Sequence, residues 1–391
     1  MDLIQRISPA LLSVLPTTPR RSAEPPAFSP SATIASTSSP LDLRTSPHNL
    51  CLRPFAVFDD DFLALLGPSP SLRVVAQDSS FRFAHEAGIW IPSSRECFFT
   101  SNQFYPDPSA NPTHKSIQIS KIKAPDTPGG TYSWEKISPS PDIPTANGGI
   151  NYNDGALFCS QGYGDALSGA LVYMDVHPPY ASQVLLNHFH GRPLNCPNDV
   201  VVLPLDGTIW FTDPDYAIIQ NLRTVQNLPT QVYCFNPATG NLRVVADGFK
   251  RPNGISFAPD FKTCYISDTN ASNGLGGKIS DVPGTIYAFD VVLSPASTKP
   301  NRPYILLNKR VFAFADSAAP DGIKTDTEGN VYSGCSDGIQ VWNSDGILIG
   351  KILIPGGIAN FCFTDPGVIL AFNENRIVEV RLNATGSIVK Y

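Results

Sequence analysis

The sequence of 391 residues contains little charge and little methionine. Charged residues make up 16% of it and methionine occurs 2 times, whereas soluble domains contain roughly 25% charged residues. It has no run of about 18 apolar residues, so no transmembrane helix is expected. Lys and Arg number 28 against 34 Asp and Glu, which gives a formal net charge of −6. Binding to nucleic acid or to an anionic membrane is therefore not expected, because it requires basic patches.

The 8 cysteines include no Cys-x-x-Cys pair, which argues against a structural zinc site. They occupy positions 51, 97, 159, 196, 234, 264, 335 and 362. Several lie inside apolar strand-like runs, and we expect these to be free, buried, small apolar side chains. The even number leaves disulfides open if the protein is secreted.

The first part of the chain differs in composition from the rest. Residues 15–47 hold 7 Pro, 7 Ser and 5 Thr, which is 19 of 33 residues. Such a segment cannot bury enough apolar surface to offset the entropy lost on ordering. We therefore predict a Pro/Ser/Thr-rich disordered extension over residues 1–47 and a folded unit over residues 48–391. Asp2 and Pro9 make the start a poor signal peptide, which favours the cytoplasm but leaves secretion open.

The folded part contains a repeated phrase: an oxygen-bearing side chain, one or two small residues, an apolar strand, a turn and a second apolar strand. It occurs six times, at intervals of 39 to 68 residues. Its first residues are Glu86, Asn147, Asn198, Asn253, Asp321 and Asn360. Further strand candidates lie between the phrases, for example over 231–237 and 284–292, so that each unit holds about four strands.

Several dipeptides with glycine mark tight hairpin turns, and their glycines suit positive φ: Asp154-Gly155, Asp206-Gly207 and Glu328-Gly329. Repeats of roughly 40–60 residues with four strands each are typical of a β-propeller. The sequence therefore predicts an all-β fold, a six-bladed β-propeller. We expect the first blade to borrow a strand from the opposite terminus, which would close the ring. Two unrelated β-sandwiches are the alternative.

In a propeller, the first residue of each innermost strand lies at one level around the central channel. The six residues that begin the phrases would then form a ring of side-chain oxygens, two of them carboxylates. Such a ring suits Ca²⁺, which takes 6–8 oxygen ligands in loose geometry. The alternative for the Asn-Gly and Asp-Gly members is an ordinary turn, since Asn and Asp form Asx turns.

At these residues the chain resembles the SMP-30/gluconolactonase family of six-bladed propellers, and within it the fungal lactonohydrolase-like branch. The motifs that carry the resemblance are Glu86-Ala-Gly-Ile-Trp90 and the stretches 147–157, 196–214, 251–268 and 320–332. The resemblance implies a divalent metal, usually calcium, although another divalent cation is open. Its implied ligands are Glu86, Asn198, Asn253 and Asp321.

The chain departs from the family at two places. Many gluconolactonase-like members have Glu-His after the cysteine of the second blade, where this chain has Ser160-Gln161. Animal members carry Arg two residues before the Asn of the Asn-Asp motif, where this chain has Cys196. The resemblance therefore does not specify a sugar lactone as the substrate.

The function that these features predict is calcium-dependent hydrolysis of the ester bond of a lactone, with the metal polarising the carbonyl and orienting water. Asp321 is the first candidate for the general base, and a role as ligand only is the alternative. Further candidates for substrate contact or support are Asn147, Gln161, His188, His190 and Asp199. His85, next to Glu86, is a natural base by its ordinary pKa. The alternative for His85, His188 and His190 is a loop or core histidine without a catalytic role.

Two other functions stay open. One is a propeller enzyme that catalyses another type of reaction on a specialised metabolite. The other is a non-catalytic binding propeller whose channel is plugged by calcium. The expected partner is a small-molecule lactone, and the sequence does not predict an oligomeric state.

Overall fold

The computed structural model describes residues 4–6, 53–107, 109, 114–269, 284–295 and 302–387. Strands dominate these ranges, and their two helices are short: α2 (Asp60–Leu66) and α3 (Tyr216–Ile219). The extension predicted over residues 1–47 lies outside the described residues except for β1 (Ile4–Arg6), which pairs in parallel with β2 (Phe55–Val57). Within these ranges no helix has the length and apolar character that crossing a membrane requires.

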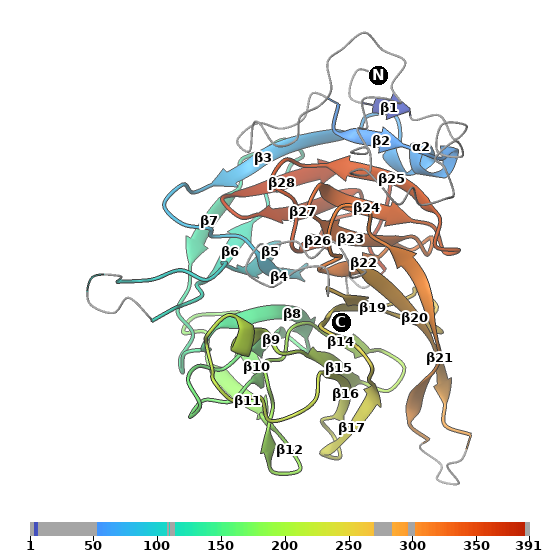
Figure 1. Cartoon of the computed structure of the whole chain (residues 1–391). Helices are drawn as coiled ribbons and strands as arrows, with labels where there is room; N and C mark the ends of the chain where they lie inside the picture. The colour runs from blue at the N-terminus through green and yellow to red at the C-terminus, as the bar shows by residue number, and fades with distance from the viewer. Residues whose placement is uncertain are drawn as a thin grey trace, which may run out of the picture.

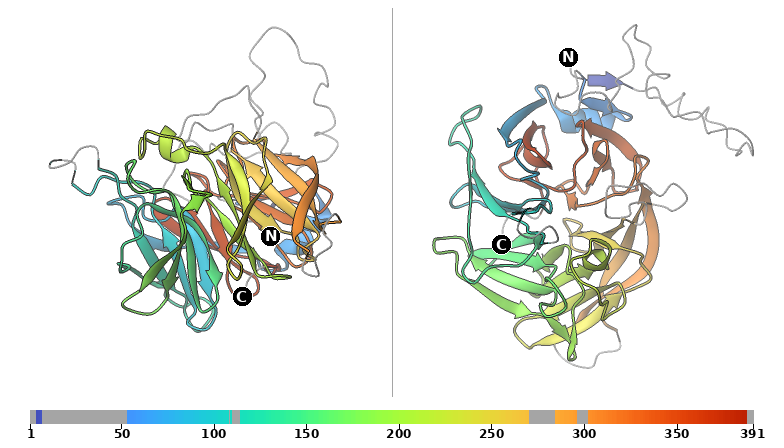
Figure 2. Two further views of the ribbon diagram at one scale, coloured as in Figure 1. Left: turned by 90° about the horizontal axis from the view of Figure 1, so that it is seen from below. Right: turned by 60° about the vertical axis from the view of Figure 1, so that its left-hand side comes forward.

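In the described part of the chain, six sheets are arranged as blades in a ring (Figures 1 and 2). The all-β, six-bladed propeller predicted from the repeats is confirmed. The innermost strands of neighbouring blades contact one another around the hub. These innermost strands are β4 (Glu86–Ile91), β8 (Ala146–Tyr152), β14 (Val200–Leu203), β18 (Pro252–Phe257), β22 (Ile323–Thr325) and β26 (Phe361–Phe363).

The first four blades each follow sequence order from the hub outward. The first continues with β5 (Glu96–Thr100), β6 (Ile119–Lys123) and β7 (Ser133–Lys136). The second continues with β9 (Gly155–Ser160), β10 (Ala170–Asp175) and β11 (Ser182–Leu186). The third continues with β15 (Thr208–Asp213), β16 (Gln231–Asn236) and β17 (Asn241–Ala246). The fourth continues with β19 (Thr263–Asp268), β20 (Thr285–Leu293) and β21 (Tyr304–Phe314).

The last two blades combine both ends of the described chain. The fifth contains β23 (Val331–Cys335), β24 (Gly338–Trp342) and β25 (Leu348–Leu353), and β2 adds to its outer edge. The sixth contains β27 (Val368–Asn373) and β28 (Arg376–Arg381), and β3 (Ser71–Gln77) is its outermost strand. The ring therefore closes by exchange between distant segments, as expected. The blade that receives the distant strand is the last one, however, and not the first.

The hydrophobic core lies between the blades. Each pair of neighbouring blades shares one cluster of buried apolar side chains. Aromatic contacts cross these interfaces, for example Trp210 against Phe257 with ring centroids 5.6 Å apart. Phe99 and Phe372 likewise stack at 5.6 Å between the first and last blades. Because both faces of each blade are covered, strands such as β15 are buried along their whole length.

The predicted turns and cysteines are largely as expected. Gly207 and Gly329 have φ of 70° and 89°, as tight turns require. At the turn before β9, however, Asn153 takes the positive φ of 50° and Gly155 begins the strand instead. Seven of the cysteines fall within the described residues, and all seven are free and buried.

Candidate active site

The six oxygen-bearing residues of the repeat lie at the start of the innermost strands, one in each blade. Glu86 is the first residue of β4, and Asn147 and Asn253 are the second residues of β8 and β18. Asn198 and Asp321 lie two residues before β14 and β22. Asn360 directly precedes β26. The repeat therefore brings residues from six distant parts of the sequence to one end of the hub.

Five of these six residues line one cavity of about 490 Å³: Glu86, Asn147, Asn198, Asn253 and Asp321. Asn360 is fully buried and does not line the cavity. Its Nδ2 donates a hydrogen bond of 2.8 Å to Oε2 of Glu86, and its Oδ1 accepts one of 2.8 Å from the backbone of Phe361. Asn360 therefore fixes the orientation of Glu86.

The glycines after three members of the ring are not turn residues. Gly148, Gly254 and Gly322 lie at the hub, where neighbouring blades approach closely. A Cβ on Gly148 would lie 2.3 Å from the carbonyl oxygen of Asn198, and one on Gly254 would lie 2.6 Å from that of Asp321. The Asn-Gly and Asp-Gly pairs thus reflect close packing of innermost strands, and the turn alternative is wrong at these positions.

The two carboxylates of the ring affect each other's ionisation. Burial raises the pKa of Glu86 to about 8, and the negative charge of Asp321 contributes to that increase. Burial also raises the pKa of Asp321 to about 6, although the positive charge of His85 opposes the change. Two carboxyl groups in one buried cavity resist ionisation together, and a cation between them would favour their charged forms.

Two ring oxygens have no hydrogen-bond partner although they are buried: Oδ1 of Asn198 and Oδ1 of Asp321. Buried polar atoms are usually satisfied, so these oxygens point to a missing partner. Carboxylate and amide oxygens are the ligands that Ca²⁺ prefers. The donor set of Glu86, Asn198, Asn253 and Asp321 therefore fits a hard divalent cation. A cluster of three or more His, Cys, Asp or Glu suited to a metal is absent from the described ranges, and the ring itself contains only two carboxylates.

A histidine and a glutamate form an ion pair beside the ring. Nδ1 of His85 lies 2.8 Å from Oε1 of Glu374, and Nδ2 of Asn102 donates to both oxygens of Glu374 at 3.2 Å. Burial alone would lower the pKa of His85, but the charges of Glu374, Glu86 and Asp321 raise it to about 9. The ion pair with Glu374 therefore favours the protonated form of His85.

The other predicted residues have different positions. Gln161 lines the cavity, is 3% exposed, and its Oε1 has no hydrogen-bond partner. His188 and His190 lie outside the cavity, on the exposed connection formed by β12 (His188–Phe189) and β13 (Arg192–Pro193). Asp199 is buried and does not line the cavity, and its Oδ2 lies 3.7 Å from Nζ of Lys324.

Sequence reasoning missed several residues of the cavity wall, among them Arg82, Asn102, Lys115 and Glu374. They lie in connections between strands, outside the repeated phrase, and their arrangement carries no periodic signal. Tyr216 begins α3 and lies 3.4 Å from Nδ2 of Asn253.

A second missed signal is the spacing Gly-x-Ser-x-Gly at residues 334–338, which places Ser336 in the cavity wall. In a serine-hydrolase elbow this motif joins a strand to a helix. Here it joins β23 to β24, two strands of one blade. The motif therefore does not have the backbone setting of a nucleophilic serine.

Comparisons with known proteins agree with this architecture. The model of the family described as SMP-30/Gluconolactonase/LRE-like region matches residues 155–369. The chain is 29% identical over 347 residues to a protein named lactonohydrolase oryL from Aspergillus oryzae, covering 83% of this chain and 73% of that protein. It is 25% identical over 334 residues to a gluconolactonase from Zymomonas mobilis, covering 83% and 84%. Among solved structures, a gluconolactonase from Xanthomonas campestris superposes with a TM-score of 0.62 at 22% identity, covering 84% and 94%.

Proposed function

Because the chain belongs to the SMP-30/gluconolactonase/LRE-like family, we propose that it hydrolyses the ester bond of a lactone in the cavity at its hub. Relatives that match over most of the chain are named lactonohydrolase and gluconolactonase. The observation that carries the proposal is the ring of side-chain oxygens in this cavity, two of which lack partners although they are buried.

The proposed cofactor is calcium, or another hard divalent cation, held by Glu86, Asn198, Asn253 and Asp321. When bound, such an ion supplies Lewis-acid polarisation of the lactone carbonyl and orientation of the attacking water. The support is chemical: all four residues offer side-chain oxygen to one cavity. Asn360 holds Glu86 in place through the 2.8 Å hydrogen bond.

Asp321 is the proposed general base. In this mechanism its carboxylate accepts a proton from water while the water oxygen bonds to the carbonyl carbon. The ring C–O bond then breaks, and the proton passes to the departing alkoxide oxygen. Proton transfer to a positioned carboxylate contributes roughly 10²–10⁴-fold, and Asp321 lines the same cavity as the other proposed ligands. The ion pair with Glu374 favours the protonated form of His85, which makes it the less suitable base.

The amides of Asn147 and Gln161 are the proposed contacts to the bound lactone. Both residues line the cavity, and Oε1 of Gln161 lacks a hydrogen-bond donor in the protein. A hydroxyl group of the substrate would supply that donor.

The test is a lactone panel assayed with metal-stripped protein, before and after calcium is restored. We expect hydrolysis only after restoration. Asp321→Asn should lower kcat by about a hundredfold or more, whereas the matched variant Asp345→Asn, at an exposed turn, should keep full activity. Circular dichroism would check that both variants are folded.

Three results would contradict the proposal in different ways. Hydrolysis that persists in the presence of a chelator would show that the reaction does not require the metal. Full activity of the Asp321→Asn variant would show that Asp321 is not the general base. Calcium binding without turnover of any lactone would favour the non-catalytic binding propeller.

A further inference from the structure

We propose that the lactone carries a carboxylate group away from its ester, and that Arg82 and Lys115 recognise this carboxylate. The inference rests on the function proposed above and names the substrate class of the same cavity. Both side chains line the cavity that contains the oxygen ring.

The segment of residues 102–104, just after β5, forms backbone contacts both with Arg82 and with the residue after Lys115. The backbone N–H of Asn102 donates a 2.9 Å hydrogen bond to the carbonyl of Arg82. On the other side of the same segment, Phe104 and Ser116 form an antiparallel bridge, and Lys115 directly precedes Ser116. The connection between β5 and β6 therefore contacts the segment of Arg82 and contains Lys115, and both side chains line the same cavity.

Lys115 is held in position without a counterion. Its Nζ donates a 2.5 Å hydrogen bond to the backbone carbonyl of Gln220, just after α3 in the third blade. The side chain of Gln103 also reaches the side chain of Gln220, at 2.5 Å. These contacts tie the connection of the first blade to the third blade and direct the ammonium group toward the cavity.

The other charges of the cavity have partners. His85 is paired with Glu374, and the proposed divalent cation would balance Glu86 and Asp321. Within the described ranges, neither Arg82 nor Lys115 lies within 4 Å of a carboxylate. The charge of Arg82 acts on Glu374 from a longer distance and helps to lower the pKa of that carboxyl group. Glu374, already paired with His85, therefore faces more positive charge on the cavity wall than it balances, and Lys115 faces no carboxylate within 4 Å in the described part of the chain.

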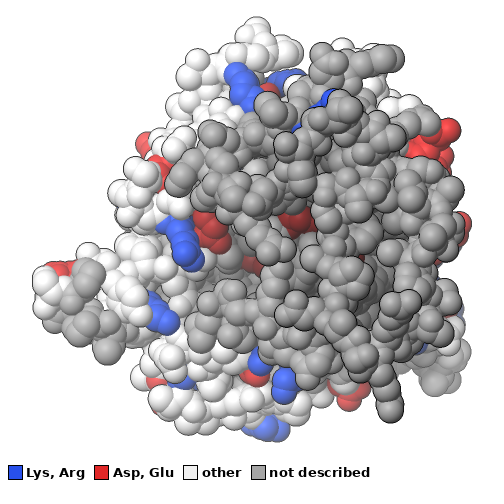
Figure 3. All heavy atoms as spheres, turned by 45° about the horizontal axis from the view of Figure 1, so that its top comes forward, with Lys and Arg blue, Asp and Glu red and all other residues white. Residues whose placement is uncertain are grey.

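This local excess stands out in a chain with a formal net charge of −6. On the face shown in Figure 3, described Lys and Arg side chains and described Asp and Glu side chains both appear. Burial lowers the pKa of Lys115, since no opposite charge supports its ammonium form. A carboxylate of the substrate would supply that charge, and the guanidinium of Arg82 suits the same group by its planar fork of donors.

The experiment compares matched substrates. Five- and six-membered lactones are each prepared with a ring carboxylate and with the corresponding neutral carboxamide, and kcat/KM is measured with the calcium-loaded protein. We expect the wild-type protein to prefer the carboxylate by about tenfold or more, the size of a charge-assisted hydrogen bond. Raising NaCl from about 0.05 M to about 0.5 M should reduce that preference by screening.

The variants are Arg82→Gln and Lys115→Gln, with Lys262→Gln as the control because Lys262 is an exposed cation on another blade. Each of the first two should lose most of the preference for the carboxylate over the carboxamide, and circular dichroism would check that the variant is folded. The control should behave as the wild type on both substrates.

Equal rates on carboxylate and carboxamide, or a preference that survives in both variants, would overturn this inference and leave lactone hydrolysis standing. If no lactone is hydrolysed, the proposed function fails, and calorimetry then decides the anion site. In that case, salt-sensitive binding of the ring-opened hydroxy dicarboxylate that is lost in Arg82→Gln would support the site, and no binding would reject it.

Discussion

At the scale of single residues, Asn360 shows how the ring is held together. The side chain is fully buried, donates to Glu86 and accepts from the backbone of Phe361. It also packs against Gly322, where an added Cβ would lie 2.3 Å from its Oδ1. Asn360 therefore connects the last blade to the first and to the fifth at the level of the cavity.

We predict that Asn360→Ala lowers the free energy of unfolding by about 1–3 kcal/mol, because it leaves buried groups without partners. It should also weaken calcium binding, since Glu86 loses the hydrogen bond that orients it. Urea unfolding and calcium titration would measure the two effects. The control is Asn343→Ala, which removes hydrogen bonds at the turn after β24 and should affect stability only. An Asn360→Ala protein with wild-type calcium affinity would contradict the positioning role.

The ring residues could be found from the sequence because each one precedes an apolar strand in a repeated phrase. Their separate tasks could not be found in that way. Asn360 and Asn147 belong to the same pattern. Asn360, however, donates a hydrogen bond to Glu86, whereas Asn147 lines the cavity. Glu374 and Arg82 were missed because they lie in connections between strands. The position of a connection depends on its packing against other blades, and the sequence shows no periodic pattern for it.

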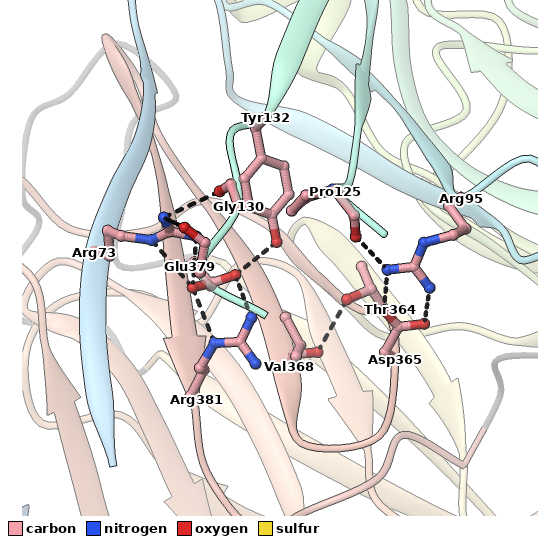
Figure 4. A network of polar contacts seen from close by, with 11 residues as sticks. Arg73, Arg95, Pro125, Gly130, Tyr132, Thr364, Asp365, Val368, Glu379 and Arg381 are labelled. Carbon is pink, nitrogen blue, oxygen red and sulfur yellow. Dashed lines mark hydrogen bonds and ion pairs between the residues drawn. The ribbon is translucent and has the colours of Figure 1, made fainter. Parts of the chain in front are cut away.

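At the scale of elements, a polar network joins the first and last blades (Figure 4). Glu379 on β28 is 2% exposed. Its carboxylate accepts hydrogen bonds from Arg381 at 2.9 and 3.0 Å and from Tyr132 of the first blade at 2.7 Å. Arg73 on β3 lies 3.2 Å from the same carboxylate and donates to the carbonyls of Gly129 and Gly130. Three segments thus meet at one buried charge.

We predict that Glu379→Ala lowers the free energy of unfolding by about 2 kcal/mol, because it leaves two arginines and a tyrosine without their shared acceptor. The matched variant is Asp365→Ala. Asp365 binds Arg95 across the same pair of blades at 2.7 Å, but its side chain is 38% exposed. Its loss should cost less than about 1 kcal/mol. Urea unfolding of the two variants would measure the difference, and equal losses would show that this network does not secure the closure.

The sequence predicted that distant segments would close the ring but assigned the exchange to the first blade. A strand pattern shows that β3 is extended and partly apolar, but it does not show which edge it joins. That choice is made by contacts such as Arg73 with Glu379, whose positions differ by 306 residues. Such pairings are set by the whole fold and not by local sequence.

At the scale of the whole molecule, the propeller brings residues from six parts of the chain to one cavity. Its interblade clusters bury both faces of the blades, so the hub is held by the entire ring. The number of blades and the family followed from the repeat and its motifs. The substrate did not, because the wall of the cavity comes from connections that differ from blade to blade.

The central claim is that the oxygens of Glu86, Asn198, Asn253 and Asp321 converge to bind a divalent cation that lactone hydrolysis needs. Isothermal titration of metal-stripped protein with calcium tests it most directly, with Glu86→Gln and Asp321→Asn as variants and Asp345→Asn as the control. We expect a single calcium site in the wild type and the control, and its loss or strong weakening in both variants. Absence of calcium binding in the wild type, or unchanged binding in both variants, would contradict the account.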